Sequence, residues 1–253
     1  MARAFTRAVS PRLAECQLTH LQRTPIDADL AAKQHAAYEK ALEGAGLILV
    51  RLPDLPDDPD AVFVEDTALL LGEHAVITRP GAPSRAGEVE STAEGLAPHL
   101  TLHRIERGHL DGGDVLMIGR TLYVGCSTRT NRDGIAALDA LVRPLGYRVI
   151  EAALGDCLHL KTGATLATPE LLLHDPKAVD PKQFAGVEPL PTDPSEADAA
   201  NVVRAGNRLI IPAGNPRTAD RLRARGLDVV EVDVSELQKA EAGVTCMSLI
   251  EGL

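Results

Sequence analysis

The chain contains 253 residues, enough for one large domain or two small ones. Hydrophobic residues make up 45% and charged residues 25%, the composition of a globular protein that buries a core without disulfide or metal support. A net charge of −10 and an aromatic content of 2% argue against nucleic acid and anionic membranes as partners.

The sequence favours a cytoplasmic protein without a membrane span. No apolar run reaches the roughly eighteen residues that a spanning helix needs, and the N-terminus lacks the apolar block of a secretory signal. The cysteines are few, scattered and outside any CxxC motif, as is typical of a reducing compartment. They supply no clustered ligand set for zinc, so we expect no metal. They are Cys16, Cys126, Cys157 and Cys246.

Short apolar runs alternate with Ala- and Leu-rich segments, which predicts an α/β fold. Predicted helices cover residues 28–44, 132–142 and 216–224, with a helical segment at 235–241. Predicted strands cover residues 46–51, 66–71, 75–78, 114–118, 121–124, 147–150, 163–167, 171–173, 202–204, 209–211 and 227–232. The proline-rich residues 176–194 follow the fourth strand pair without a long helix.

These segments repeat. Three hairpins begin with Asp or Asn and turn at Gly72, Gly119 or Gly206. A glycine followed by a predicted strand ends each repeating unit, at Gly46, Gly146 and Gly226. A strand–strand–helix–strand unit of about 40 to 50 residues fits about five times into the chain, which favours a closed five-bladed α/β propeller. The alternative is an open α/β sheet with chance similarity.

Cys246 and His159 are the candidates for nucleophilic and proton-transfer chemistry. Cys246 lies in Gly243-Val-Thr-Cys near the C-terminus; a lone intracellular cysteine is more often a small buried hydrophobe. His159 lies between Leu158 and Leu160, so in a strand its ring would face away from theirs, toward solvent or the propeller axis. The alternative is a structural strand histidine.

Two acidic motifs precede apolar strands. In Asp111-Gly-Gly-Asp114, the glycines allow the backbone to approach another group closely, although ordinary turns also favour this composition. Glu65-Asp66 would suit a cationic ligand if the backbone turns there, because adjacent strand residues point to opposite faces. The alternative is a charged, solvated strand end.

Arg85 and Arg129 occupy equivalent places in successive units, each after the second hairpin strand. Two converging arginines would bind a carboxylate bidentately, whereas most arginines lie on the surface. Together, a thiol, an imidazole, carboxylates and two arginines match an amino acid with a guanidinium side chain.

The motifs resemble dimethylarginine dimethylaminohydrolase, a guanidino-modifying family with the five-bladed pentein propeller. The resemblance covers the chain from about residue 60 in family order and is carried by Phe63-Val-Glu-Asp, Thr78-Arg-Pro-Gly-Ala-Pro-Ser-Arg, Leu110-Asp-Gly-Gly-Asp-Val, Ser127-Thr-Arg-Thr-Asn, Leu158-His-Leu-Lys and Thr245-Cys. It implies a single catalytic domain over residues 1–253 that converts methylated arginines to citrulline without a cofactor.

The resemblance also implies the roles of individual residues. Cys246 would be the nucleophile, His159 the general acid and base, and Asp111 the residue that orients His159. Glu65 and Asp66 would hold the guanidinium. The remaining substrate contacts would be Leu18, Asp60, Arg85, Arg129 and Ala240.

Other interpretations stay open at this point. Arginine deiminases perform the same chemistry on free arginine, but they are generally longer. A non-catalytic propeller, such as the ribosome-binding translation factor of the same fold, or a cytoplasmic arginine sensor, would not need the thiol and imidazole. A homodimer is compatible with the sequence, which does not fix the oligomeric state.

Overall fold

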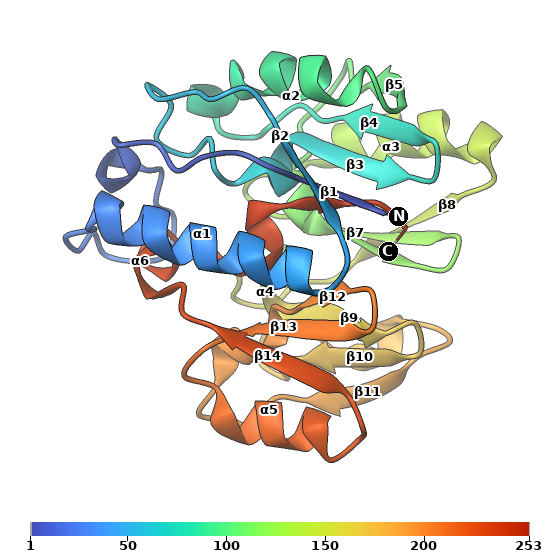
Figure 1. Cartoon of the computed structure of the whole chain (residues 1–253). Helices are drawn as coiled ribbons and strands as arrows, with labels where there is room; N and C mark the ends of the chain where they lie inside the picture. The colour runs from blue at the N-terminus through green and yellow to red at the C-terminus, as the bar shows by residue number, and fades with distance from the viewer. Residues whose placement is uncertain (1, 253) are drawn as a thin grey trace.

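Short strands gather into five sheets in the computed structural model, which describes residues 2–252 (Figure 1). The strands are β1 (Arg3–Thr6), β2 (Ile48–Arg51), β3 (Ala68–Leu71), β4 (His74–Ile77), β5 (Thr101–Arg104), β6 (Val115–Ile118), β7 (Thr121–Gly125), β8 (Arg148–Ala152), β9 (Ala164–Thr168), β10 (Leu171–His174), β11 (Glu188–Pro191), β12 (Val203–Ala205), β13 (Arg208–Pro212), β14 (Asp228–Val232) and β15 (Leu249–Ile250).

Helices connect the strands, and several single turns precede them. The α-helices are α1 (Ala28–Gly44), α2 (Glu88–Leu96), α3 (Arg132–Val142), α4 (Leu160–Gly163), α5 (Pro216–Arg223) and α6 (Ser235–Gln238). The 3-10 turns are η1 (Leu13–Glu15), η2 (Val64–Thr67), η3 (Pro83–Arg85), η4 (Gly112–Asp114), η5 (Arg143–Leu145), η6 (Pro181–Gln183), η7 (Ala197–Ala200) and η8 (Thr245–Met247). None of these helices in residues 2–252 is long and apolar enough to cross a bilayer.

Every sheet has the same three-strand plan. The orders are β15-β1-β2, β3-β4-β5, β6-β7-β8, β9-β10-β11 and β12-β13-β14. The middle strand is antiparallel to the first strand and parallel to the third in each of them. The predicted five-fold strand plan is therefore confirmed, although the β9-β10-β11 unit has the turn η6 in place of an α-helix, and the C-terminal β15 completes the N-terminal sheet.

Glycines mark equivalent points of the units because the backbone there is left-handed. The hairpin glycines Gly72, Gly119 and Gly206 have φ of 64°, 58° and 59°. The glycines that precede the third strands, Gly46, Gly146 and Gly226, have φ of 87°, 82° and 83°. Left-handed φ is costly for residues with a Cβ atom, so the repeated glycines reflect repeated backbone geometry.

The inner strands of the five sheets line a common axis. An axial cavity of about 150 Å³ is bordered by residues of β3, β6, β9, β12 and β15, one strand from each sheet. This arrangement is the closed five-bladed α/β propeller that the repeats predict. In the part of the chain that the structure describes, buried apolar side chains form five clusters, built largely from Ala, Val, Leu and Ile.

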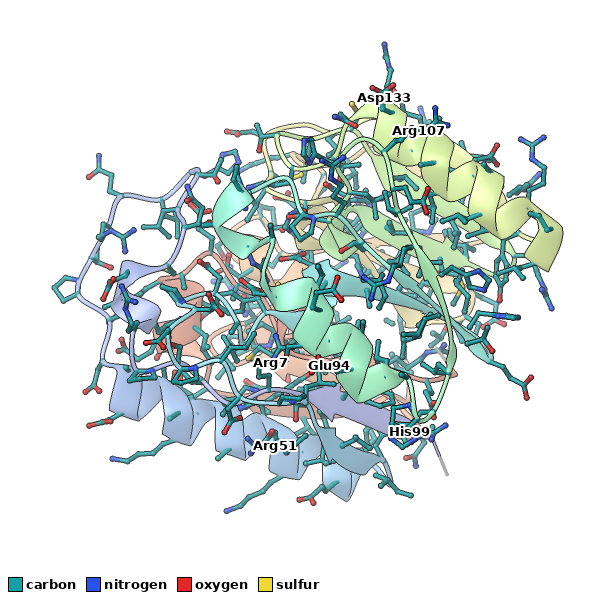
Figure 2. All side chains as sticks on the ribbon, turned by 90° about the horizontal axis from the view of Figure 1, so that it is seen from above. Arg7, Arg51, Glu94, His99, Arg107 and Asp133 are labelled. Atoms are coloured by element: carbon teal, nitrogen blue, oxygen red, sulfur yellow. The ribbon has the colours of Figure 1, made fainter. Side chains whose placement is uncertain are left out.

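Helices α1, α2 and α3 cover the outside of the blades, as the view from above shows (Figure 2). The predicted bounds of α1 and α3 are confirmed. Both helices begin with a side-chain cap, since Asp27 accepts the Leu30 amide and Asn131 accepts the Gly134 amide.

Three sequence predictions need correction. Residues 64–67 form the turn η2 rather than the start of a strand, and His159 precedes the one-turn helix α4 rather than lying in a strand. The helical segment predicted to end at Glu241 stops at Gln238. The proline-rich stretch contains the strand β11. Because β11 lies at the edge of its sheet, its prolines can be placed without breaking the hydrogen bonds between strands.

Arg7 is a fully buried cation that ties β1 to the loop preceding the first acidic motif. Its guanidinium donates to the carbonyls of Pro53 and Ala61, both at 3.0 Å, and to Thr92 Oγ1 at 2.9 Å. Burial lowers the pKa of Arg7 to about 10, and the charge of Glu88 opposes this shift. The loop that carries Asp60 is thus positioned from inside the protein.

We expect Arg7→Met to lower the free energy of unfolding by about 3 kcal/mol, because it leaves several buried acceptors unpaired. Arg12→Met is the control, since Arg12 forms an exposed pair with Glu15 and its loss should change stability far less. Urea unfolding of both variants measures the difference. Equal stabilities would contradict the structural role of Arg7.

Candidate active site

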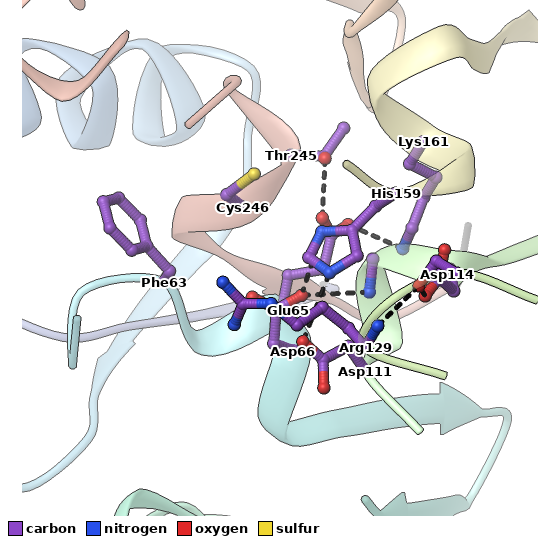
Figure 3. Close-up of polar contacts among 12 residues, drawn as sticks. Phe63, Glu65, Asp66, Asp111, Asp114, Arg129, His159, Lys161, Thr245 and Cys246 are labelled. Atoms are coloured by element: carbon purple, nitrogen blue, oxygen red, sulfur yellow. Dashed lines mark hydrogen bonds and ion pairs between the residues drawn. The ribbon is translucent and has the colours of Figure 1, made fainter. Parts of the chain in front are cut away.

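A short turn precedes the inner strand of each blade, and all five turns lie at the same end of the axis. They are η2 before β3, η4 before β6, α4 before β9, η7 before β12 and η8 before β15. Five of the candidate residues belong to these turns or flank them, namely Glu65, Asp66, Asp111, His159 and Cys246 (Figure 3). The propeller therefore gathers side chains that are far apart in the sequence.

The turns bond to one another in a closed ring. Asn201 makes two of the links, donating from Nδ2 to the Lys161 carbonyl and accepting the Thr245 amide, both at 2.9 Å. The other links are Gly113 N to Asp66 Oδ1 (3.1 Å), Leu160 N to Asp114 Oδ1 (3.1 Å) and Thr245 Oγ1 to Glu65 Oε2 (2.7 Å). Each blade thus fixes its two neighbours at the site.

His159 lies between two buried carboxylates. Its Nε2 is 3.2 Å from Asp111 Oδ2, and its Nδ1 is 3.7 Å from Asp66 Oδ1. Burial alone would lower the pKa of His159, but the charge of Asp66, the hydrogen bond to Asp111 and the charge of Asp114 raise it to about 9. The imidazole is therefore protonated at neutral pH in the free protein.

The glycines of the Asp111-Gly-Gly-Asp114 turn make this packing feasible. A Cβ atom at Gly113 would lie 2.6 Å from His159 Nδ1 and 2.8 Å from Asp66 Oδ1. One at Gly112 would lie 2.0 Å from the carbonyl oxygen of Glu65. The close backbone approach predicted from the sequence is confirmed, and the groups approached are the imidazole and the first acidic motif.

Cys246 lies in η8, directly after a residue of the ring. Its Sγ accepts the Gly243 amide at 3.3 Å. Burial raises the pKa of Cys246 well above its usual range, and the charges of Glu65 and Asp66 add to this, against a smaller opposing effect of the Gly243 amide. The free protein therefore holds a neutral thiol, which a cation near the sulfur would ionise.

A small cavity joins these groups. It has a volume of about 30 Å³, room for a water molecule or two rather than an amino acid. Of the predicted site residues, those that line it are Asp60, Asp66, Arg85, Arg129, His159, Ala240 and Cys246. Asp111 lies behind His159, whereas Leu18 packs against a neighbouring apolar cluster and Glu65 borders the axial cavity.

The two predicted arginines have different partners. Arg85 is buried and pairs with Glu88 and Asp66, and it also donates to the Phe63 carbonyl at 2.8 Å. Arg129 makes a single side-chain hydrogen bond among the described residues, to Thr19 Oγ1 at 2.9 Å. Most N–H groups of Arg129 are therefore available to a ligand, whereas most of those of Arg85 are already bonded.

Glu65 is likewise occupied. Its carboxylate pairs with Lys161 Nζ at 2.6 Å and accepts the Thr245 hydroxyl at 2.7 Å. It is still close enough to raise the pKa of Cys246. Lys161 lies in the motif Leu158-His-Leu-Lys, so the sequence contained it, but nothing there showed that it would meet a carboxylate two blades away.

Residues 17–21 cover the cavity. The Gln17 amide donates to Asp60 at 3.0 Å, and the Thr19, His20 and Leu21 amides all donate to the Glu241 carboxylate. Glu241 has a left-handed backbone with φ of 62°, which is unusual for a residue with a side chain. Sequence analysis missed Glu241, since no local pattern distinguishes it from a surface carboxylate.

Asp66, Asp111 and His159 also place oxygen and nitrogen atoms within 4.8 Å of one another, a spacing that metal ligands share. Asp66 already pairs with Arg85, and Asp111 Oδ1 accepts the Gly81 amide at 2.8 Å. Both carboxylates also contact the imidazole of His159, so the three side chains form a hydrogen-bonded carboxylate–imidazole group.

Comparison with known proteins gives a consistent result, although no protein-family model matches the chain. A dimethylarginine dimethylaminohydrolase of Streptomyces coelicolor is 40% identical over 251 residues, covering 98% of this chain and 96% of the relative. The Pseudomonas aeruginosa enzyme, a Cys-to-Ser variant complexed with citrulline, has a TM-score of 0.94 at 35% identity and 99% coverage of both chains. A His-to-Gly variant with an S-methyl-L-thiocitrulline adduct has a TM-score of 0.93 at 35% identity, covering 99% and 100%.

The fold is thus the pentein propeller that the sequence resemblance implied. Sequence identity of 40% over 98% of the chain also identifies the family within this fold. The protein belongs to the dimethylarginine dimethylaminohydrolase family.

We expect Gly113→Ala to displace His159 and lower kcat by roughly 100-fold while the fold is kept, because the added methyl group would overlap the imidazole. Gly87→Ala is the matched control, since a Cβ atom there meets nothing within 4 Å. Steady-state kinetics with circular dichroism measures both. Normal kcat in Gly113→Ala would show that the close approach does not matter.

The raised pKa of His159 also predicts a pH dependence of stability. An unfolded histidine titrates near pH 6.5, so the carboxylate contacts of His159 stabilise the fold fully below that pH and are lost as pH rises through about 9. The loss is on the order of 3 kcal/mol. Unfolding free energies of wild type and His159→Asn between pH 6 and pH 10 measure it. Parallel profiles for the two proteins would contradict the assignment.

Proposed function

We propose that this protein hydrolyses Nω-methylated arginines to citrulline and methylamine or dimethylamine, as one catalytic domain with Cys246 as the nucleophile. The observation that carries the proposal is the single buried cavity onto which Cys246, His159, Asp66 and Arg129 all open. It presents anionic groups beside a thiol and a cation at another wall. This charge pattern complements an amino acid whose side chain ends in a guanidinium.

In the proposed complex, Asp66 attracts the guanidinium and Arg129 binds the α-carboxylate. Arg85 contributes its remaining N–H group and holds Asp66 in place. Asp60 lies near the α-amino group, and the main chain at Leu18 and Ala240 completes the enclosure. Glu65, which bonds Lys161 and Thr245, holds the guanidinium together with Asp66 through its remaining acceptor positions.

The first chemical step uses the charge of the substrate. The guanidinium favours loss of the Cys246 proton to solvent, because it offsets the burial and carboxylates that raise the pKa of the thiol. The thiolate attacks the guanidinium carbon, and protonated His159 gives its proton to the departing amine as the carbon–nitrogen bond breaks. A thiouronium group remains on the sulfur, and His159 is neutral.

The second step restores the enzyme. Neutral His159 takes a proton from water as the oxygen attacks the thiouronium carbon. The carbon–sulfur bond breaks, the thiolate leaves, and the protonated urea returns a proton to the sulfur to give citrulline. Asp111 and Asp66 keep the imidazole oriented through both transfers. The citrulline complex and the thiocitrulline adduct of the related enzymes support this course.

The cellular setting follows as a proposal. Free cysteines, one of them the exposed Cys126, suit a reducing compartment, so we place the enzyme in the cytoplasm. The homodimer remains a prediction. Light scattering of the purified protein tests it.

We expect Cys246→Ser to abolish turnover of dimethylarginine while citrulline binding and the fold are kept, because a buried serine hydroxyl does not ionise near neutral pH. Mass spectrometry of acid-quenched wild-type enzyme should find an adduct on the peptide containing Cys246. Cys126→Ser is the control and should keep full activity. Turnover in Cys246→Ser, or an adduct at another cysteine, would overturn the proposal.

The carboxylate-binding role of Arg129 predicts a substrate-dependent effect. Arg129→Ala should raise KM for dimethylarginine by about 10-fold or more, the cost of a charge-assisted contact. On a dimethylated guanidine that lacks the α-carboxylate, wild type and variant should agree. Equal losses on both substrates would show that Arg129 does not bind the carboxylate. Parallel assays with free arginine distinguish a deiminase.

A further inference from the structure

Asp114 ends the Asp111-Gly-Gly-Asp turn and is completely buried, yet the proposed reaction gives it no task. Its two carboxylate oxygens accept hydrogen bonds from loops of two different blades. Oδ1 accepts the amide of Leu160 at 3.1 Å, directly beside His159. Oδ2 accepts the hydroxyl of Ser127 at 2.6 Å. One carboxylate thus touches the segment that carries the imidazole and the loop that leads to Arg129.

Ser127 passes this contact on to Arg129. Its Oγ accepts the amides of Arg129 at 2.9 Å and of Thr130 at 3.2 Å. A hydroxyl has one proton to donate and two lone pairs, so these contacts and the bond to Asp114 use all of them. The loop that presents Arg129 is therefore folded around a hydroxyl whose proton requires an acceptor, and Asp114 supplies it.

The position of Asp114 tolerates little variation. A Cβ atom at Gly125 would lie 3.0 Å from its Oδ1, so the strand β7 packs directly against the carboxylate. Burial raises the pKa of Asp114, whereas the charge of His159 and the bond from Ser127 lower it. The charge of Asp114 in turn raises the pKa of His159.

We infer that Asp114 is a positioning residue that couples His159 to Arg129, so that a single buried carboxylate holds both the proton-transfer group and the group that binds the substrate carboxylate. This inference rests on the proposed function. Asp111 orients the ring of His159, and Asp114 fixes the backbone on which the ring stands. The two carboxylates of one turn therefore perform separate tasks.

Charged groups on several elements surround His159, so the experiment must separate the effect of Asp114 from the effects of the others. Asp66 and Asp111 contact the ring, and Asp114 lies behind it. The other titratable or charged groups on the shared cavity are Asp60, Arg85, Arg129, Glu241 and Cys246. Asp114 bonds the segments of both His159 and Arg129 through its carboxylate, whereas Asp111 reaches the Arg129 loop through its backbone amide, which donates to Thr130 Oγ1 at 3.1 Å.

The test compares Asp114→Asn with Ser127→Ala. Asp114→Asn should raise KM for dimethylarginine and lower kcat, each by about 10-fold, and should move the His159 titration seen by NMR to lower pH. Ser127→Ala should raise KM to a similar extent on the carboxylate-bearing substrate only, with the His159 titration unchanged. Ser127→Thr keeps the hydroxyl and should restore KM.

Glu196→Gln is the matched control. Glu196 is a buried carboxylate that accepts the amides of Arg217 and Thr218 at 2.9 and 2.8 Å, outside the site. Its variant should lose stability without changing KM, kcat or the His159 titration. Wild-type kinetics and titration in Asp114→Asn would overturn the inference. If that variant does not fold, equal KM values in Ser127→Ala and wild type overturn it.

Failure of the proposed function gives a different pattern. Wild type would then not turn over dimethylarginine, whereas the His159 titration in the free protein would still respond to Asp114→Asn. Calorimetry with citrulline and with its analogue lacking the α-carboxylate reports on the Arg129 loop without turnover. Citrulline affinity unchanged in Ser127→Ala would overturn the coupling.

Discussion

The ring of hydrogen bonds among the five turns is the constraint on which the rest of the structure depends. Five inner strands begin at one end of a common axis, so the turns before them meet where little water can reach. An unpaired buried polar group costs about 1 to 3 kcal/mol, so these turns must satisfy one another. Glu65, Asp114 and Asn201 do so across blade boundaries. Closure of the propeller and assembly of the site therefore depend on the same hydrogen bonds.

The ring also separates residues that hold the site from residues that are free to react. Glu65, Asn201 and Thr245 use their polar atoms within the ring. His159 directly precedes the ring residue Leu160, and Cys246 directly follows Thr245. Both side chains open onto the cavity. The same distinction divides the arginines, since Arg85 is bonded on several sides and Arg129 is not. The carboxylate of Glu65, which the sequence resemblance assigns to the substrate, also links blades in the free protein through Lys161 and Thr245.

Sequence patterns predicted the parts of the fold that depend on local backbone geometry. Left-handed glycines such as Gly72 and Gly146 marked the repeating unit, and Asp27 and Asn131 capped two helices at the predicted residues. The patterns missed β15, which pairs with β1 across almost the whole chain length, because such pairing leaves no local signal. They also missed that residues near Asp66 and His159 form single turns. The motifs indicated which residues matter, but not which of them bond to one another.

Burial explains why the protonation states were beyond sequence reasoning. In the free protein burial, together with the charges of Glu65 and Asp66, raises the pKa of Cys246 and keeps its thiol neutral, whereas carboxylates around His159 outweigh burial and raise the pKa of its imidazole. In the proposed mechanism, a guanidinium beside Asp66 and Cys246 offsets the cost of forming the thiolate and leaves His159 in the form that can protonate an amine. The proposed mechanism thus gives these carboxylates two tasks, since they attract the guanidinium and, together with burial, keep the Cys246 thiol protonated until it has bound.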